Sequence, residues 1–168
     1  MKKATCLAVV IFLGAVSSFA QHVPQGDVGT AYSFVHFGPG SNANGGSFSA
    51  AVNTNRWFGI AGDFGVYSES PTTIFTILGG PRFSLRDRSQ FTPYVETLIG
   101  DTHFTTTGLP GTNGFTVLLG GGVELGMSRS VALRPQFDYL AIRTGGSTLN
   151  TARISVGLAF RMGRLSRR

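Results

Sequence analysis

The stretch VALRPQFDYLAIR (Val131–Arg143) alternates between two chemically different sets of side chains. One set is mainly apolar and comprises Val131, Leu133, Pro135, Phe137, Tyr139 and Ala141. The other comprises Ala132, Arg134, Gln136 and Asp138. Side chains of a β-strand point alternately to its two faces, so this stretch predicts a strand with one apolar and one polar face.

The same period of two recurs along most of the chain. We expect eight strands, at about residues 28–37, 46–53, 57–68, 73–84, 91–99, 115–125, 131–143 and 152–162. Glycines interrupt every stretch long enough to hold a helix, and the chain has 24 of them. The sequence therefore predicts an all-β fold, an eight-stranded antiparallel up-and-down barrel.

The N-terminal segment has the three parts of a secretory signal peptide. Lys2 and Lys3 are followed by an apolar stretch over residues 7–16, and small residues Ser18 and Ala20 precede a cleavage point. The apolar stretch is too short to cross a bilayer as a helix. We therefore expect residues 1–20 to be a cleavable signal peptide and the protein to be exported.

Four segments are predicted on this basis. The signal peptide (1–20) precedes a short N-terminal segment (21–26), the barrel (27–163) and a basic C-terminal tail (164–168). The single cysteine, Cys6, lies in the signal peptide, so we expect no disulfide and no thiol chemistry in the mature chain. The formal net charge is +6 and both lysines lie in the signal peptide, a modest excess that does not suggest nucleic-acid binding.

The polar face of the strands favours a barrel in lipid over a soluble one. It carries mainly Gly, Ser, Ala and Thr, with about one charge per strand, which is sparse for a surface in contact with water. We expect these charges to form a luminal network, because buried charges need partners. The predicted network comprises Asp63, Arg82, Glu96, Glu124, Arg134, Asp138, Arg153 and Arg161. Its role is either structural, closing the interior, or that of a gate in a narrow ion path.

The connections between strands are predicted to alternate in length. Segments 38–45, 69–72, 103–114 and 144–150 are mostly long and rich in small polar residues, whereas 53–56, 85–90 and 127–130 are short. Long loops on one rim and tight turns on the other are typical of outer-membrane barrels. Arginines follow the same division, and we expect a solvated face on the turn rim and tail from Arg56, Arg86, Arg88, Arg129, Arg164, Arg167 and Arg168.

In the order and spacing of several short stretches, the chain resembles the small outer-membrane β-barrel family that includes the OmpA transmembrane domain, OmpX and the neisserial opacity proteins. The stretches are GGPRFS (79–84), FTPYVE (91–96), GGGVE (120–124), LRPQFDY (133–139) and SVGLAF (155–160). The resemblance implies eight strands, periplasmic termini and insertion by the outer-membrane assembly machinery. It also implies that Phe160 acts as the assembly-signal aromatic, although the family's signal usually ends the chain and this chain continues to Arg168.

No residue set in the sequence points to catalysis, a cofactor or a metal. His22, His36 and His103 are expected in flexible or rim segments, and no His-x-Ser pair lies on a strand. A metal site would need three or four convergent ligands. We therefore expect a non-enzymatic outer-membrane protein with a structural or surface role, in contact with lipid and with long loops that bind an extracellular ligand. The alternatives are a small pore, a lipid-modifying enzyme and a soluble periplasmic lipocalin-like binding protein, and the oligomeric state stays open.

Overall fold

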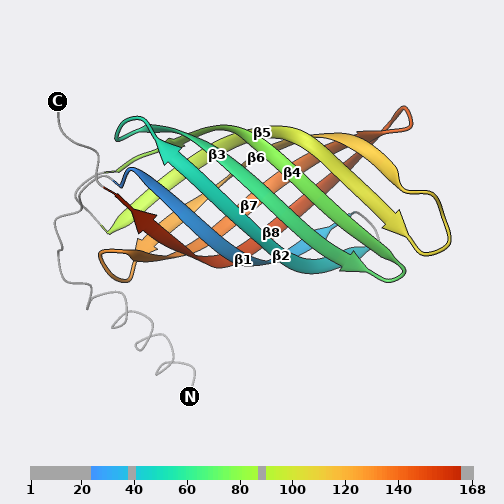
Figure 1. Ribbon diagram of the computed structural model, residues 1–168, viewed down its shortest axis with the longest axis horizontal. Coiled ribbons are helices and arrows are strands. Elements are labelled where there is room, and N and C mark those ends of the chain that lie inside the picture. The colour runs from blue at the N-terminus through green and yellow to red at the C-terminus, as the bar shows by residue number, and fades with distance from the viewer. Residues whose placement is uncertain (1–23, 38–40, 87–89, 164–168) are drawn as a thin grey trace, which may run out of the picture.

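The computed structural model describes residues 24–37, 41–86 and 90–163 and shows one closed barrel of antiparallel strands (Figure 1). The predicted signal peptide and tail lie outside the described residues. The strands are β1 (Gly26–His36), β2 (Asn42–Asn53), β3 (Phe58–Glu69), β4 (Thr72–Ser84), β5 (Phe91–Thr106), β6 (Thr112–Gly126), β7 (Val131–Thr144) and β8 (Ser147–Met162). The predicted eight-stranded barrel is confirmed.

Each strand pairs with the next along the chain, and β8 pairs with β1 to close the barrel. The closing ladder runs without a register shift from Gly26 opposite Met162 to His36 opposite Ala152. β1 begins and β8 ends at the same end of the barrel, on the left of Figure 1. We call this end, with the connections 54–57, 85–90 and 127–130, the turn side, and the opposite end the loop side.

The outer surface of the barrel is apolar along its middle. Large hydrophobic side chains point outward from every strand, as the predicted alternation requires; Ile60, Ile77 and Leu119 are each more than 60% exposed. A soluble barrel would turn such side chains inward. The outward direction of the apolar face is that of a membrane barrel. No helix within the described ranges is long and apolar enough to cross a membrane.

The loop-side connections are short, and the prediction of long loops on that rim is wrong. Only residues 37–41, 70–71, 107–111 and 145–146 lie between strands there, and the turn-side connections are of similar length. The predicted loops at 103–114 and 144–150 are largely parts of β5, β6 and β8. A strand that continues beyond the apolar band needs no apolar alternation, because both of its faces can be polar while the backbone ladder persists.

Candidate functional site: the luminal charge network

The eight side chains of the predicted luminal network all point into the barrel. They come from β3 to β8, and each sits on the face opposite to the exposed apolar residues of its strand. Seven ion pairs within the interior involve all eight of them, together with Asp27 of β1. The network therefore connects strands on opposite walls of the barrel.

Arg82 of β4 joins two carboxylates near the turn side. Its Nε donates to Glu96 Oε2 at 2.7 Å, and its Nη1 lies 3.3 Å from Asp27 Oδ1. Arg82, Glu96 and Asp27 are each no more than 2% exposed. The link from Arg82 to Asp27 spans the lumen between β4 and β1, so it ties the wall of the barrel to the strand that closes it.

Arg134 of β7 makes the second crossing of the lumen. Its Nη2 donates to Glu124 Oε1 at 2.7 Å and also to Asp27 Oδ1, and its Nη1 donates to Ser49 Oγ at 3.1 Å. Glu124 accepts a further bond from Arg161 Nη2 at 3.1 Å. Charge-assisted bonds of this kind are the strong ones in a low-dielectric interior. This turn-side group therefore holds three arginines and three carboxylates.

Arg153 of β8 is the centre of a second group, further from the turn side. Its Nη1 donates to Asp63 Oδ1 at 2.7 Å and to the Tyr67 hydroxyl at 2.6 Å, while its Nε donates to Asp138 Oδ2 at 2.7 Å. All four side chains are buried. One arginine here faces two carboxylates, so this middle group carries one excess negative charge when both are ionised.

Gln136 and Tyr94 connect the two groups. Gln136 Nε2 donates to Glu96 Oε1 at 3.0 Å and to Asp138 Oδ1 at 2.8 Å, and Gln136 Oε1 accepts from the Tyr94 hydroxyl at 2.7 Å. The Tyr94 ring also faces the guanidinium of Arg82, whose Cζ is 4.8 Å from the ring centroid. A cation over an aromatic face gains additional attraction when water is excluded.

Glycines on the inner wall provide the space that these large side chains need. A Cβ on Gly65 would clash with the Tyr67 ring, and one on Gly120 would clash with the Asp138 carboxylate. Glycine in a strand commonly marks a place where another group approaches closely. Gly120 and Gly122 of the glycine run thus belong to the packing of the network.

Apolar side chains fill the lumen beside the middle group, where Leu78 of β4 stands opposite Asp63 of β3. Leu98 of β5 is paired with Leu118 of β6, and Leu118 is paired with Leu140 of β7. These leucines pack with Leu78 and Ile142 in one buried cluster. The interior therefore holds an ion-pair network and, beside its middle group, a buried hydrophobic cluster.

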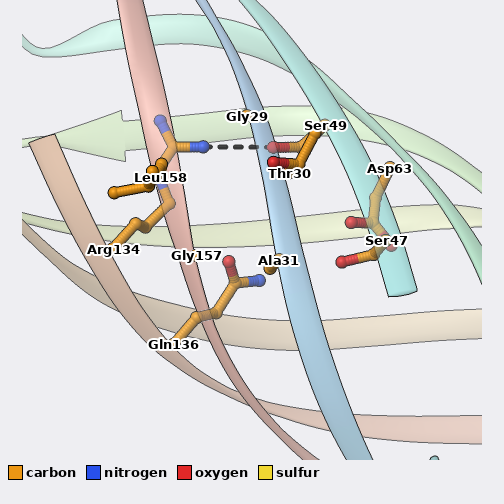
Figure 2. A pocket seen from close by; sticks show the side chains of 10 residues that line it. All are labelled: Gly29, Thr30, Ala31, Ser47, Ser49, Asp63, Arg134, Gln136, Gly157 and Leu158. Atoms are coloured by element: carbon orange, nitrogen blue, oxygen red, sulfur yellow. Dashed lines mark hydrogen bonds between the residues drawn. The ribbon is translucent and has the colours of Figure 1, made fainter. Parts of the chain in front are cut away.

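One small cavity borders the network (Figure 2). It has a volume of about 10 Å³, which is room for about one water molecule. Ser47, Ser49 and Asp63 line it from one wall and Arg134 and Gln136 from another, and Figure 2 marks the bond from Arg134 to Ser49. A cavity of this size cannot hold a lipid, a metabolite or a cofactor.

Asp27 is the charged residue that the sequence analysis left out of the network. Tyr32 and Phe34 face outward on β1, and extending that alternation back along the strand places Asp27 on the inner face. The predicted network has four acids and four arginines, so its charges balance without Asp27. Tyr67 and Gln136 also belong to the network, and their strands' alternation places both inward.

The histidines lie apart from the network. His36 and His103 are exposed at the loop-side ends of β1 and β5, and each ring Nδ1 is hydrogen-bonded to an asparagine on the next strand, Asn42 at 2.7 Å and Asn113 at 2.5 Å. His22 lies outside the described residues. Among the residues that the structure describes, no three His, Cys, Asp or Glu side chains are placed to hold a metal ion.

Phe160 lies on the outer face of β8, close to the end of the strand. It is 43% exposed and stands opposite Val28 of β1 and Val131 of β7. An outward aromatic on the closing strand is available to a partner outside the barrel. Its role as an assembly signal stays a prediction.

Comparisons with solved structures identify the fold. No protein-family model matches the chain, and no curated protein matches its sequence. Neisserial surface protein A (NspA) has 14% identity and a TM-score of 0.65, over 82% of this chain and 96% of that one. The N-terminal β-barrel domain of Pseudomonas aeruginosa OprF has 13% identity and a TM-score of 0.56, over 82% and 99%.

A third similar structure is the outer membrane enzyme PagL, with 10% identity and a TM-score of 0.50 over 81% of this chain and 99% of that one. The fold thus occurs in a protein described as an enzyme as well as in others, and it does not by itself decide the chemistry. These likenesses agree with the resemblance to the OmpA and OmpX group. The chain has the fold of the small eight-stranded outer-membrane β-barrels.

Proposed function

We propose that this protein is a non-enzymatic outer-membrane barrel with a closed interior, acting as a structural or surface protein and not as a channel. The observation that carries the proposal is the filling of the lumen by the ion-pair network and by the leucine cluster beside its middle group. Eight strands enclose only enough space for side chains. A solute would have to displace these side chains to pass.

The ion pairs and the leucines oppose permeation for different reasons. An ion entering the network would have to break arginine–carboxylate bonds that are buried and satisfied. Beside the middle group, the side chains of Leu98, Leu118 and Leu140 offer no polar group to replace the ion's hydration shell. Hydrophobic constrictions of this kind close a pore by excluding water.

The apolar outer surface supports a location in the outer membrane with lipid as the main partner. Phe48 and Phe64 stand opposite each other on β2 and β3, and both are nearly half exposed. A soluble lipocalin-like binder would instead need a polar exterior and a ligand cavity. Delivery by the outer-membrane assembly machinery, with Phe160 as a recognised aromatic, belongs to the same proposal.

We place contacts with external ligands at the loop-side rim. The ends of β5 and β6 extend there with polar residues such as His103 and Asn113 facing outward. With connections this short, such a ligand would meet a rigid rim and not flexible loops. No specific ligand follows from these residues.

Cell fractionation followed by gel electrophoresis tests the location. We expect the protein in the outer-membrane fraction, with a mobility in SDS that changes on boiling because the closed barrel resists the detergent. The matched sample is the same fraction left unheated. Recovery from the soluble periplasm without detergent would contradict the proposal.

Planar-bilayer recordings test the closed interior. We expect no stepwise conductance from protein whose insertion is verified by the heat-dependent gel shift. A Leu98→Ser/Leu118→Ser variant serves as the comparison, because it places two polar side chains in the apolar cluster and leaves the ion pairs in place. Discrete conductance steps from the unaltered protein would instead establish the pore alternative.

A further inference from the structure

Arg86 continues the inner face of β4 beyond the end of the strand. Leu85 N still bonds to Pro93 O at 2.9 Å, so the β4–β5 ladder persists past Ser84. Side chains at Arg82 and Ser84 point inward, and Arg86 takes the next inward position. Its Nη1 and Nη2 atoms are buried. The prediction that Arg86 belongs to the solvated rim is therefore wrong.

The buried Arg86 guanidinium stands near the network without being bonded to it. Neither Nη atom has a hydrogen-bond partner among the described residues. Burial lowers the pKa of Arg86, while the carboxylates of Glu124 and Asp27 act in the opposite direction. The charge thus lies within electrostatic reach of the turn-side group. A buried donor left unpaired is uncommon and asks for a reason.

The distribution of charge along the lumen supplies that reason. The turn-side group is neutral by itself, with three arginines and three carboxylates. The middle group has one excess carboxylate around Arg153. Asp27 Oδ2, on the turn-side group, is also buried without a partner. With all of these carboxylates ionised, the described lumen is one positive charge short, and Arg86 at its mouth provides that charge.

We propose that Arg86 is a cation-excluding plug at the turn-side mouth of the barrel. Its fixed positive charge repels cations that the excess negative charge of the middle group would otherwise attract. Arginine suits this role because it stays ionised even when buried. An arginine in a narrow passage is a known kind of barrier to cations. This inference rests on the proposed closed interior and names the residue that guards its turn-side entrance.

A cysteine reporter next to Arg86 tests the inference. Thr92 is 1% exposed, points inward opposite Glu124, and its Oγ1 has no partner among the described groups. Thr92→Cys therefore removes no hydrogen bond. In a Cys6→Ser background, its reaction rates with a cationic and an anionic methanethiosulfonate reagent are compared in three proteins: the reporter alone, the reporter with Arg86→Gln, and the reporter with Arg56→Gln. Arg56 is an exposed arginine on the same side.

We expect Arg86→Gln to raise the ratio of cationic to anionic labelling about tenfold, because one charge close to the reagent's path is removed. Arg56→Gln should leave the ratio unchanged. An unchanged ratio in Arg86→Gln, or an equal rise with both reagents, would overturn the plug, since the latter indicates only a loosened barrel. Labelling by neither reagent in the Arg86→Gln protein would also overturn it, because the entrance would then be closed without Arg86. The gel shift verifies folding of each variant. Conductance of the unaltered protein would defeat the closed interior, and the labelling ratio would still report on Arg86 separately.

Discussion

Arg153 shows how a single residue decides whether the interior is stable. It bonds to Asp63 and Asp138 with its Nη1 and Nε atoms, and both carboxylates are buried. Removing one partner of a buried pair leaves an uncompensated charge, which costs far more than the pair itself contributes. Each arginine of the network therefore compensates the charge of the buried carboxylates around it, and its removal destabilises them.

Arg153→Gln should lower the free energy of unfolding by about 3–5 kcal/mol, the usual cost of breaking a buried ion pair. The measurement is urea unfolding of the protein folded into lipid vesicles. Arg143→Gln is the matched control, because Arg143 is exposed near the loop side. Adding Asp138→Asn to Arg153→Gln should recover part of the loss. Equal stability of the Arg153 and Arg143 variants would show that the ion pairs do not hold the interior.

At this scale the sequence predicted the charges that lie inside clear alternation and missed those at its edges. Asp138 and Arg134 lie in the longest alternating stretch, so their inward direction could be read directly. Asp27 is the first inward residue of β1, and Arg86 takes the next inward position beyond the end of β4, where the pattern begins or fades. Their burial depends on where the ladder ends, which side-chain polarity does not report.

At the scale of the strands, close approach across the closing seam depends on residues without side chains. A Cβ on Gly157 of β8 would lie 2.6 Å from Ala31 Cβ and would also meet the backbone oxygen of Thr30 on β1. The backbone there must move to admit even a methyl group. By contrast, a Cβ on the outward-facing Gly62 would come no closer than 3.6 Å, to Leu78 O.

Gly157→Ala should therefore destabilise the barrel by about 1–3 kcal/mol, as overpacking usually does. Gly62→Ala is the matched control and should be neutral or slightly stabilising, since glycine weakens a strand. Samples of each variant are incubated at increasing temperatures and run on gels without boiling. The fraction of folded protein at each temperature measures the stability of both variants. A Gly157→Ala barrel as heat-resistant as the unaltered one would mean that the seam tolerates separation of β8 from β1.

The number of strands and the faces of their middle parts followed from the sequence, but the loop-side ends did not. Residues such as Asn113 and Thr148 break the apolar alternation and were assigned to loops, yet both lie within strands. Alternation reports the contrast between lipid and lumen. On the loop side of the apolar band there is no such contrast, and only backbone hydrogen bonds continue the strand.

For the whole molecule, the polarity of the barrel is the reverse of that of a soluble protein. The ionised side chains are inside, where Glu96 and Arg82 are nearly inaccessible, and large apolar side chains such as Ile60, Ile77 and Phe137 are outside. A thin polar face of Gly, Ser, Ala and Thr with about one charge per strand already favoured this arrangement in the sequence. The arrangement is stable only if the surroundings are apolar, because exposed hydrophobic area of this extent would otherwise drive association.

Placing a charge on the outer surface tests this polarity at two depths of one strand. Ile99 and Thr105 both face outward on β5; Ile99 lies in the apolar band and Thr105 is exposed near the loop-side end. Ile99→Arg should lower the free energy of unfolding in vesicles by about 2–4 kcal/mol, and Thr105→Arg by about 0–1 kcal/mol, since the cost of a charge falls from the bilayer centre to its interface. If water covered this surface, Ile99→Arg would instead be neutral or improve solubility. Urea titrations of both variants in vesicles therefore decide whether lipid covers the apolar band, and equal effects at the two positions would contradict a membrane location.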